Sequence, residues 1–120
     1  MIITSSFIVF YKPSEFSTLT GLKIEKFLKA AGVPEDVFAV AVGAKEVGEQ
    51  LLAMPLDGYF FTGSYRTGLY IYEKVAPKMV PCQLELGGKD PLYIADDVAD
   101  IQSVAAGTAD GAFYNNGQSC

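Results

Sequence analysis

The feature that most constrains the fold is a repeated alternation between short apolar runs and longer segments with helical spacing. Residues 7–11, 37–42 and 58–62 are the apolar runs, and each is typical of a buried strand. After each run, apolar residues recur every three or four positions, beginning near residues 15 and 44 and just after 63. Apolar strands joined through helices by short loops favour parallel pairing with right-handed crossovers. The alternation therefore predicts an α/β fold with a parallel sheet.

Local signals bound the first of these helices. Pro13 ends the first strand, because proline fixes φ and cannot donate to a sheet ladder. Ser14 or Ser17 offers a cap for the helix that follows. Gly32, with Pro34 two residues later, predicts where that helix ends.

The pattern changes after residue 77. Residues 80–86 form a fourth strand-like apolar run, and a shorter one follows at residues 91–95. A final helix is predicted from about Asp100, because apolar residues share one helical face from there to residue 112. The polar, glycine-containing stretch 115–120 is typical of a turn.

Size and charge exclude some classes of function. The 120 residues have the length of about one domain, and with half of them hydrophobic the chain can bury a sizeable core. The net charge of −5 argues against a nucleic-acid partner, because no basic patch is available to neutralise phosphates.

Residue types exclude others. The sequence has no histidine, which removes Ser-His and Cys-His dyads and any histidine-ligated metal, so no metal site is predicted. No apolar run reaches the length of a membrane span, and the first residues lack the basic region of a signal peptide. Two cysteines do not make a disulfide framework, so a reducing, cytoplasmic location is expected.

One carboxylate lies inside the fourth apolar run. Glu85 is flanked by Leu84 and Leu86, and Gly87-Gly88 follow at once, where the backbone can turn or approach a ligand closely. A carboxylate among apolar neighbours loses solvation, which would raise its pKa toward the range useful for a general base. The alternative is that Glu85 points outward from an alternating strand.

Ligands of parallel α/β sheets bind at the carboxyl ends of the strands. Gly63-Ser64 follows a strand and opens a helix, whose free N–H groups and dipole could hold a phosphate. The Gly-x4-Gly spacing up to Gly68 is neither a P-loop nor the usual dinucleotide fingerprint, and a plain tight turn is an alternative. Lys12 and Glu15, at the end of the first strand, could hydrogen-bond a ribose diol or simply form a solvated strand end.

The two cysteines lie in different settings. Cys82 belongs to an apolar strand and reads as a small buried hydrophobe. Cys120 lies in a polar Gly-Gln-Ser-Cys turn, where a reactive thiol could find exposure and hydrogen-bond donors. With no histidine in the chain, Glu85 is the candidate base for such a thiol.

Four ordered motifs then carry a family resemblance. Lys12-Pro13-Ser14-Glu15, Phe61-Thr62-Gly63-Ser64 with Gly68, Leu84-Glu85-Leu86-Gly87-Gly88-Lys89 and Gly117-Gln118-Ser119-Cys120 resemble those of the NAD(P)-dependent aldehyde dehydrogenase superfamily. The resemblance covers the chain from about residue 8 to residue 120. It implies a Rossmann-like parallel sheet with flanking helices, a small-molecule aldehyde as substrate and a dinucleotide cofactor.

The resemblance also implies roles for individual residues. Cys120 matches the nucleophile, and Glu85 matches the general base that activates water for deacylation. Glu15 matches, with Lys12, a residue that holds the adenosine ribose, and its carboxylate would repel a 2′-phosphate, which favours NAD over NADP. Pro34 matches the adenine pocket. Gly63, Ser64 and Gly68 match the motif beside the pyrophosphate. Thr62 and Leu86 match positions that line the nicotinamide side.

Relatives in this family are much longer, which shapes what we expect of the chain. Residues 1–84 would form a partial NAD-binding domain and residues 85–120 the start of the catalytic domain. The segment through which full-length relatives form homo-oligomers is absent, so we expect a fragment that is inactive alone. The alternatives are one piece of a split enzyme, a non-catalytic nucleotide-binding remnant, or an aggregation-prone remnant without function.

Overall fold

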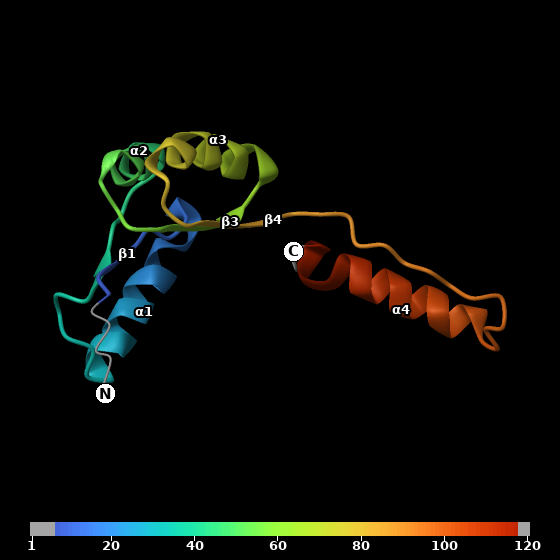
Figure 1. Cartoon of the computed structure of the whole chain (residues 1–120). Helices are drawn as coiled ribbons and strands as arrows, with labels where there is room; N and C mark the ends of the chain where they lie inside the picture. The colour runs from blue at the N-terminus through green and yellow to red at the C-terminus, as the bar shows by residue number, and fades with distance from the viewer. Residues whose placement is uncertain (1–6, 118–120) are drawn as a thin grey trace, which may run out of the picture. The chain divides into compact units, whose positions relative to one another are not determined.

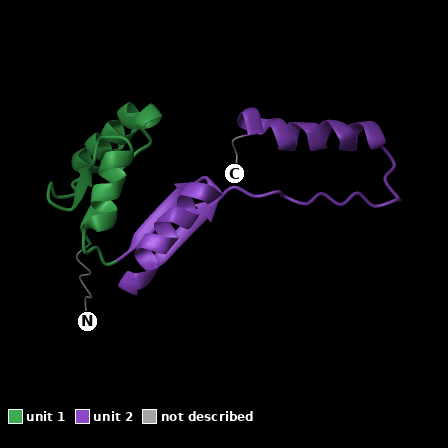
Figure 2. Ribbon diagram, turned by 90° about the horizontal axis from the view of Figure 1, so that it is seen from above, with its two compact units in different colours: residues 1–57 green, residues 58–120 purple. Residues whose placement is uncertain are grey.

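The computed structural model describes residues 7–117 of the chain. The chain divides into two compact units, residues 1–57 and residues 58–120, which are coloured separately in Figure 2. Each unit is an α/β arrangement built around one pair of parallel strands. The α/β class and the parallel pairing predicted from the alternation are therefore confirmed, in two two-stranded sheets.

Unit 1 pairs two short strands and carries two α-helices (Figure 1). Strands β1 and β2 run parallel, with Val9 opposite Phe38, and the rings of Tyr11 and Phe38 lie 5.9 Å apart. Both strands are shorter than the apolar runs that predicted them. The elements are β1 (Val9–Tyr11), the 3₁₀ turn η1 (Glu15–Ser17), α1 (Thr18–Ala30), β2 (Phe38–Val40) and α2 (Lys45–Ala53).

The ends of the first helical segment follow the predicted signals. The Ser14 side chain accepts a hydrogen bond from the backbone N–H of Phe16 at 3.3 Å and caps η1, which leads into α1. At the other end, Gly32 takes a φ of +92°, the left-handed conformation that glycine adopts without steric cost. Sequence therefore predicted both the cap and the stop of this helix.

Unit 2 contains the longer strand pair and the last helix (Figure 1). Strands β3 and β4 run parallel in a register that starts with Tyr59 opposite Cys82 and ends with Gly63 opposite Leu86. The elements are β3 (Tyr59–Gly63), α3 (Tyr65–Val75), the 3₁₀ turn η2 (Ala76–Lys78), β4 (Cys82–Leu86), α4 (Ile101–Phe113) and the 3₁₀ segment η3 (Tyr114–Gly117).

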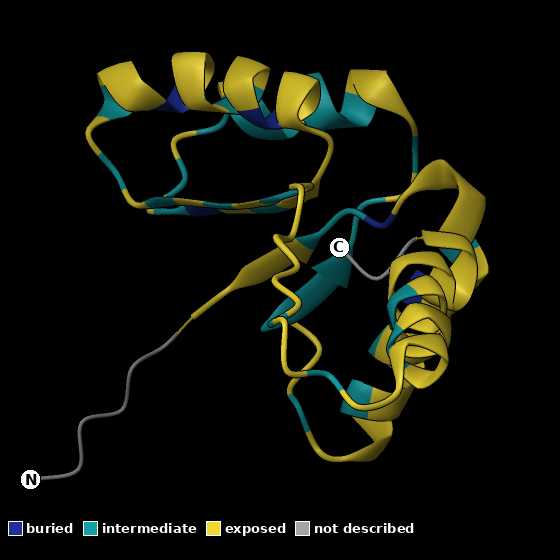
Figure 3. Ribbon diagram, turned by 90° about the vertical axis from the view of Figure 1, so that its right-hand side faces the viewer, coloured by how far each residue is buried: buried dark blue, intermediate teal, exposed yellow. Residues whose placement is uncertain are grey.

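The core of unit 2 lies where α3 packs on one face of β3 and β4 (Figure 3). Val75, near the end of α3, is fully buried, and Tyr59 is 8% exposed at the start of β3. Lys78 Nζ donates a hydrogen bond to the Tyr59 hydroxyl at 2.6 Å, which ties η2 to β3. Helix α3 is thereby fixed to the strand pair at its C-terminal end.

The last helix begins as predicted. Asp100 Oδ1 accepts hydrogen bonds from the backbone N–H groups of Gln102 and Ser103, at 3.1 and 3.0 Å, and so caps α4. The apolar run at residues 91–95 has no regular secondary structure. None of the helices in the described part of the chain is both long and apolar enough to cross a membrane.

The predicted domain division between residues 84 and 85 is not the division between the compact units. Strand β4 runs through residues 84 and 85 without a break, and the two units divide between residues 57 and 58. The 1–84 and 85–120 domains concern the complete fold of a longer protein, and they stay a prediction.

Candidate functional site

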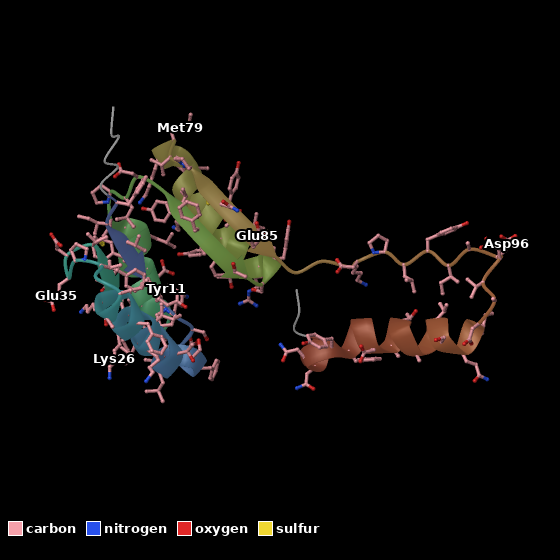
Figure 4. All side chains as sticks on the ribbon, turned by 90° about the horizontal axis from the view of Figure 1, so that it is seen from below. Tyr11, Lys26, Glu35, Met79, Glu85 and Asp96 are labelled. Atoms are coloured by element: carbon pink, nitrogen blue, oxygen red, sulfur yellow. The ribbon has the colours of Figure 1, made fainter. Side chains whose placement is uncertain are left out.

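Four of the predicted site residues meet at the carboxyl ends of β3 and β4. In the parallel register, Thr62 lies opposite Glu85, and Gly63 lies opposite Leu86. Figure 4 shows Glu85 where the strand pair gives way to the connection that follows β4. This is the edge at which parallel α/β sheets bind ligands. Residues from two separate motifs are therefore neighbours in space.

Glu85 is exposed, which corrects the expectation that its apolar neighbours desolvate it. Along β4, Cys82, Leu84 and Leu86 are half-buried, whereas Gln83 and Glu85 are exposed. The strand alternates, so the two leucines beside Glu85 point to the opposite face of the sheet. The alternative stated from the sequence, that Glu85 points outward from an alternating strand, is what the structure shows.

A second polar side chain on this face was missed from sequence. Gln83 Nε2 donates a hydrogen bond to Glu85 Oε1 at 3.2 Å. The signal was available, because residues two apart in a strand share a face. Gln83 therefore holds the carboxylate of the candidate base in one orientation.

The start of α3 adjoins this edge. Ser64 is the N-cap: its Oγ accepts a hydrogen bond from the backbone N–H of Thr67 at 3.3 Å and lies 3.0 Å from the Thr67 hydroxyl. The remaining first-turn N–H groups of an α-helix have no acceptor within the helix, and the dipole makes this end positive. Arg66 adds a positive side chain in the same turn. The N-terminal end of α3 is thus suited to bind an anionic group.

In unit 1 the predicted residues fall at two ends of the strand pair. Lys12 and Glu15 follow β1 at its carboxyl end, and Lys12 Nζ donates to the Pro13 carbonyl at 3.0 Å. Glu15 is exposed in the first position of η1. Pro34 precedes β2, at the amino end of that strand, where its carbonyl accepts from the Val37 N–H at 3.1 Å. Unit 1 therefore brings Lys12 and Glu15 to one end and leaves Pro34 at the other.

The described residues offer polar groups for an organic ligand. No group of three His, Cys, Asp or Glu side chains within residues 7–117 is arranged to hold a metal ion. The strand ends instead offer one carboxylate in each unit and a capped helix start in unit 2. This combination suits recognition of a hydroxyl- and phosphate-bearing molecule.

Comparison with known proteins matches residues 3–120 to the aldehyde dehydrogenase family. The chain belongs to the aldehyde dehydrogenase family.

Individual aldehyde dehydrogenases are similar over nearly all of the chain. The N-succinylglutamate 5-semialdehyde dehydrogenase of Sphingopyxis alaskensis is 41% identical over 116 residues, 93% of this chain and 24% of that protein. The NAD-dependent aldehyde dehydrogenase of Sinorhizobium meliloti matches in structure with a TM-score of 0.85 and 38% identity, over 94% of this chain and 23% of that one. An aldehyde dehydrogenase of Mycobacterium tuberculosis, complexed with NAD⁺, matches in structure with a TM-score of 0.88 and 32% identity, over 94% of this chain and 23% of that one.

The fold of this chain is therefore that of one segment of an aldehyde dehydrogenase. The chain spans about a quarter of the length of the relatives that it matches. The resemblance inferred from the four motifs is confirmed by the family match.

The two cysteines stand differently in this aldehyde dehydrogenase segment. Cys120, the predicted nucleophile, lies outside the described residues together with Gln118 and Ser119. Cys82 is half-buried as a free thiol in β4, and burial raises the pKa of the Cys82 thiol above its ordinary value. The prediction that Cys82 is a buried hydrophobe agrees with this position on the inner face of β4.

Cys82 is expected to react slowly with iodoacetamide at pH 7. The thiolate is the nucleophile, and a raised pKa lowers its fraction at neutral pH, so the rate should keep rising beyond the pH at which a free cysteine levels off. The measurement is the alkylation rate of the Cys120→Ser variant between pH 7 and 10. Cys82→Ala is the matched variant that leaves Cys120 alone, and a Cys82 rate at pH 7 equal to that of a free cysteine would contradict the expectation.

Proposed function

We propose that this chain supplies part of the cofactor site and the catalytic groups of an NAD-dependent aldehyde dehydrogenase, which oxidises an aldehyde to a carboxylic acid. The observation that carries the proposal is the register of β3 and β4. It sets Thr62 and Gly63, at the start of the cofactor motif, directly opposite Glu85 and Leu86 of the catalytic motif. A carboxylate base and an anion-binding helix start then serve one reaction centre.

The residues present fit a dinucleotide. In unit 2, Gly63 ends β3 and has no side chain that would keep a ligand away from the backbone. Ser64 caps α3, and the first turn of α3 can receive a pyrophosphate. Gly68 closes this motif, and Thr62 and Leu86 lie on the nicotinamide side. In unit 1, Lys12 and Glu15 hydrogen-bond the adenosine ribose, and Pro34 belongs to the adenine pocket.

The chemistry follows from the nucleophile and the base. Cys120 Sγ attacks the aldehyde carbon and forms a thiohemiacetal. The cofactor supplies a hydride acceptor at its nicotinamide ring. Loss of a hydride from the thiohemiacetal carbon, together with the proton of its hydroxyl group, leaves a thioester on Sγ. Glu85 then takes a proton from water, and the water oxygen attacks the thioester carbon. The C–S bond breaks, the proton passes from Glu85 to Sγ, and the carboxylic acid is released.

Glu15 favours NAD over NADP in this proposal. Its carboxylate accepts hydrogen bonds from the ribose hydroxyls, whereas a 2′-phosphate in the same place would meet a like charge. The exposed position of Glu15 in the first turn of η1 leaves the carboxylate accessible for this contact.

Calorimetric titration of the purified chain with NAD and NADP tests the cofactor assignment. We expect NAD to bind more tightly than NADP, and Glu15→Ala to weaken NAD binding by about tenfold, the scale of a lost hydrogen bond to a charged group. Glu15→Ala should also reduce the difference in affinity between NAD and NADP. Ser64→Ala should weaken the binding of NAD and of NADP equally, because it alters the site for the pyrophosphate, which both cofactors contain.

Two control variants separate binding from folding. Asp57→Ala removes an exposed carboxylate that precedes β3, away from every residue assigned to the cofactor, and should leave both affinities unchanged. Asp100→Ala removes an equivalent helix cap from α4 and should lower stability as Ser64→Ala does without changing cofactor affinity. Equal NAD affinity in the parent chain and in Glu15→Ala would show that the ribose assignment is wrong.

A further inference from the structure

Gly68 lets α3 lie against the end of β4. This glycine is buried in the second turn of α3. A methyl group built on it would overlap Leu86 Cδ2, and would lie only 2.8 Å from Cδ1 and 3.2 Å from Cγ. Real side chains essentially never come that close, so α3 can contact Leu86 in this way only because residue 68 has no side chain.

A second glycine makes room in the same layer. A methyl group on Gly63 would lie 2.5 Å from Cζ of the Phe61 ring. Phe61 is opposite Leu84, and Gly63 is opposite Leu86, so all four residues share the face of the strand pair that α3 covers. The Leu86 side chain therefore occupies the space beside Gly68, and the Phe61 ring occupies the space beside Gly63.

Sterics explain the glycine at position 68 in a way that they do not at the glycines of α4. Glycine inside a helix is less favourable than alanine, because it loses more conformational freedom on folding. In α4, a methyl group on Gly107 would meet no atom within 4 Å. Gly107 can thus be replaced without a clash, whereas a side chain at position 68 would force the Leu86 side chain to move.

Leu86 is also the last anchored residue of β4. Residues 87–94 are all exposed, and they begin with Gly87-Gly88, so the chain beyond Leu86 contributes little to holding the strand end. Glu85 precedes Leu86 and points to the opposite, exposed face. The contact of Leu86 with α3 therefore adds to the pairing with Thr62 and the hydrogen bond from Gln83 in holding the strand end that carries Glu85.

We infer that Gly68 is a positioning residue for Glu85 and acts through Leu86. By admitting the leucine, Gly68 fixes the end of β4 to the first turns of α3, so that the candidate base and the cofactor helix keep a constant relation. The inference rests on the proposed function only for the role of Glu85. The contact itself is open to test without any ligand.

A double-mutant cycle between Gly68→Ala and Leu86→Ala tests the inference in the full chain. Gly68→Ala should lower the Tm by roughly 5 °C or more, the scale of overpacking in a small domain, and should shift the backbone amide resonances of Glu85 and Gly87. In the Leu86→Ala background, the same substitution should leave the Tm unchanged or raise it, because the clashing methyls are gone. Gly107→Ala is the matched control. It should leave the Tm unchanged or raise it, both in the parent chain and in the Leu86→Ala background.

Each result bears on the inference separately from the proposed function. Rescue by Leu86→Ala, with the Glu85 amide resonance displaced only when Leu86 is present, supports it. Equal effects of Gly68→Ala in both backgrounds, or an unmoved Glu85 resonance, would overturn it. If Gly68→Ala alone does not fold, the comparison of Leu86→Ala with the double variant decides, and a Tm loss there overturns the inference. Failure of NAD to bind in titrations of the parent chain would instead count against the proposed function.

Discussion

Replacing Cys120 with alanine is expected to abolish aldehyde oxidation, with kcat/KM falling by about 10⁴-fold or more. The reason is that the proposed mechanism passes through a covalent bond to Sγ, and no other group in the reaction can carry the acyl intermediate. The assay requires the rest of the fold. We would place residues 3–120 in the matching segment of the Sinorhizobium meliloti relative and measure NADH formation with an aldehyde in excess.

Cys82→Ala is the matched control for this experiment. Cys82 lies on the inner face of β4 with a thiol pKa raised by burial, so its loss should affect packing and leave kcat within a fewfold of the parent chimera. An active Cys120→Ala chimera, or a Cys82→Ala chimera as impaired as Cys120→Ala, would show that the nucleophile has been assigned to the wrong cysteine.

Replacing Glu85 with glutamine should block turnover after the first chemical step. Steady-state kcat is expected to fall by about 10²–10⁴-fold, the usual contribution of a general base. In the proposed mechanism hydride transfer precedes deacylation, so a burst of NADH of about one equivalent per site should remain while the thioester accumulates on Cys120. Rapid-mixing absorbance gives the burst, and mass spectrometry of the quenched enzyme gives the acyl adduct.

Gln83→Ala is the companion variant on the same face of β4. It removes the 3.2 Å hydrogen bond to Glu85 Oε1 but leaves the carboxylate in place, so kcat should fall far less than in Glu85→Gln. Loss of the burst together with turnover in Glu85→Gln would move the role of Glu85 to deprotonation of the Cys120 thiol. An unchanged kcat would remove it from the mechanism.

Local features of the fold were predictable because short stretches of sequence specify them. Ser14 and Asp100 cap helical segments through their own side chains, and Gly32 stops α1 through its own φ. The alternation of apolar strands and helices likewise predicted parallel pairing. Strand ends were predicted less well. Val9–Tyr11 and Phe38–Val40 pair over three residues each, although the apolar runs that predicted them are longer.

Burial was harder to predict at the candidate site. Two leucines flank Glu85 in sequence, which suggested a desolvated carboxylate. The strand alternates, so these leucines face α3 while Glu85 and Gln83 are exposed on the other side. Which face of a strand is covered depends on an element elsewhere in the chain, and residues adjacent in sequence do not report it.

The sequence by itself determined the family, the order of the four motifs and the residue types available for chemistry, because each is a property of contiguous residues. Only the tertiary structure decided that Thr62 stands opposite Glu85 and that Gly68 is filled by Leu86. These relations join residues about 20 positions apart, through a parallel register and a helix-to-strand contact. The physical reason is that register and close packing are set jointly by the strands and the helix that covers them, and none of these elements specifies them alone.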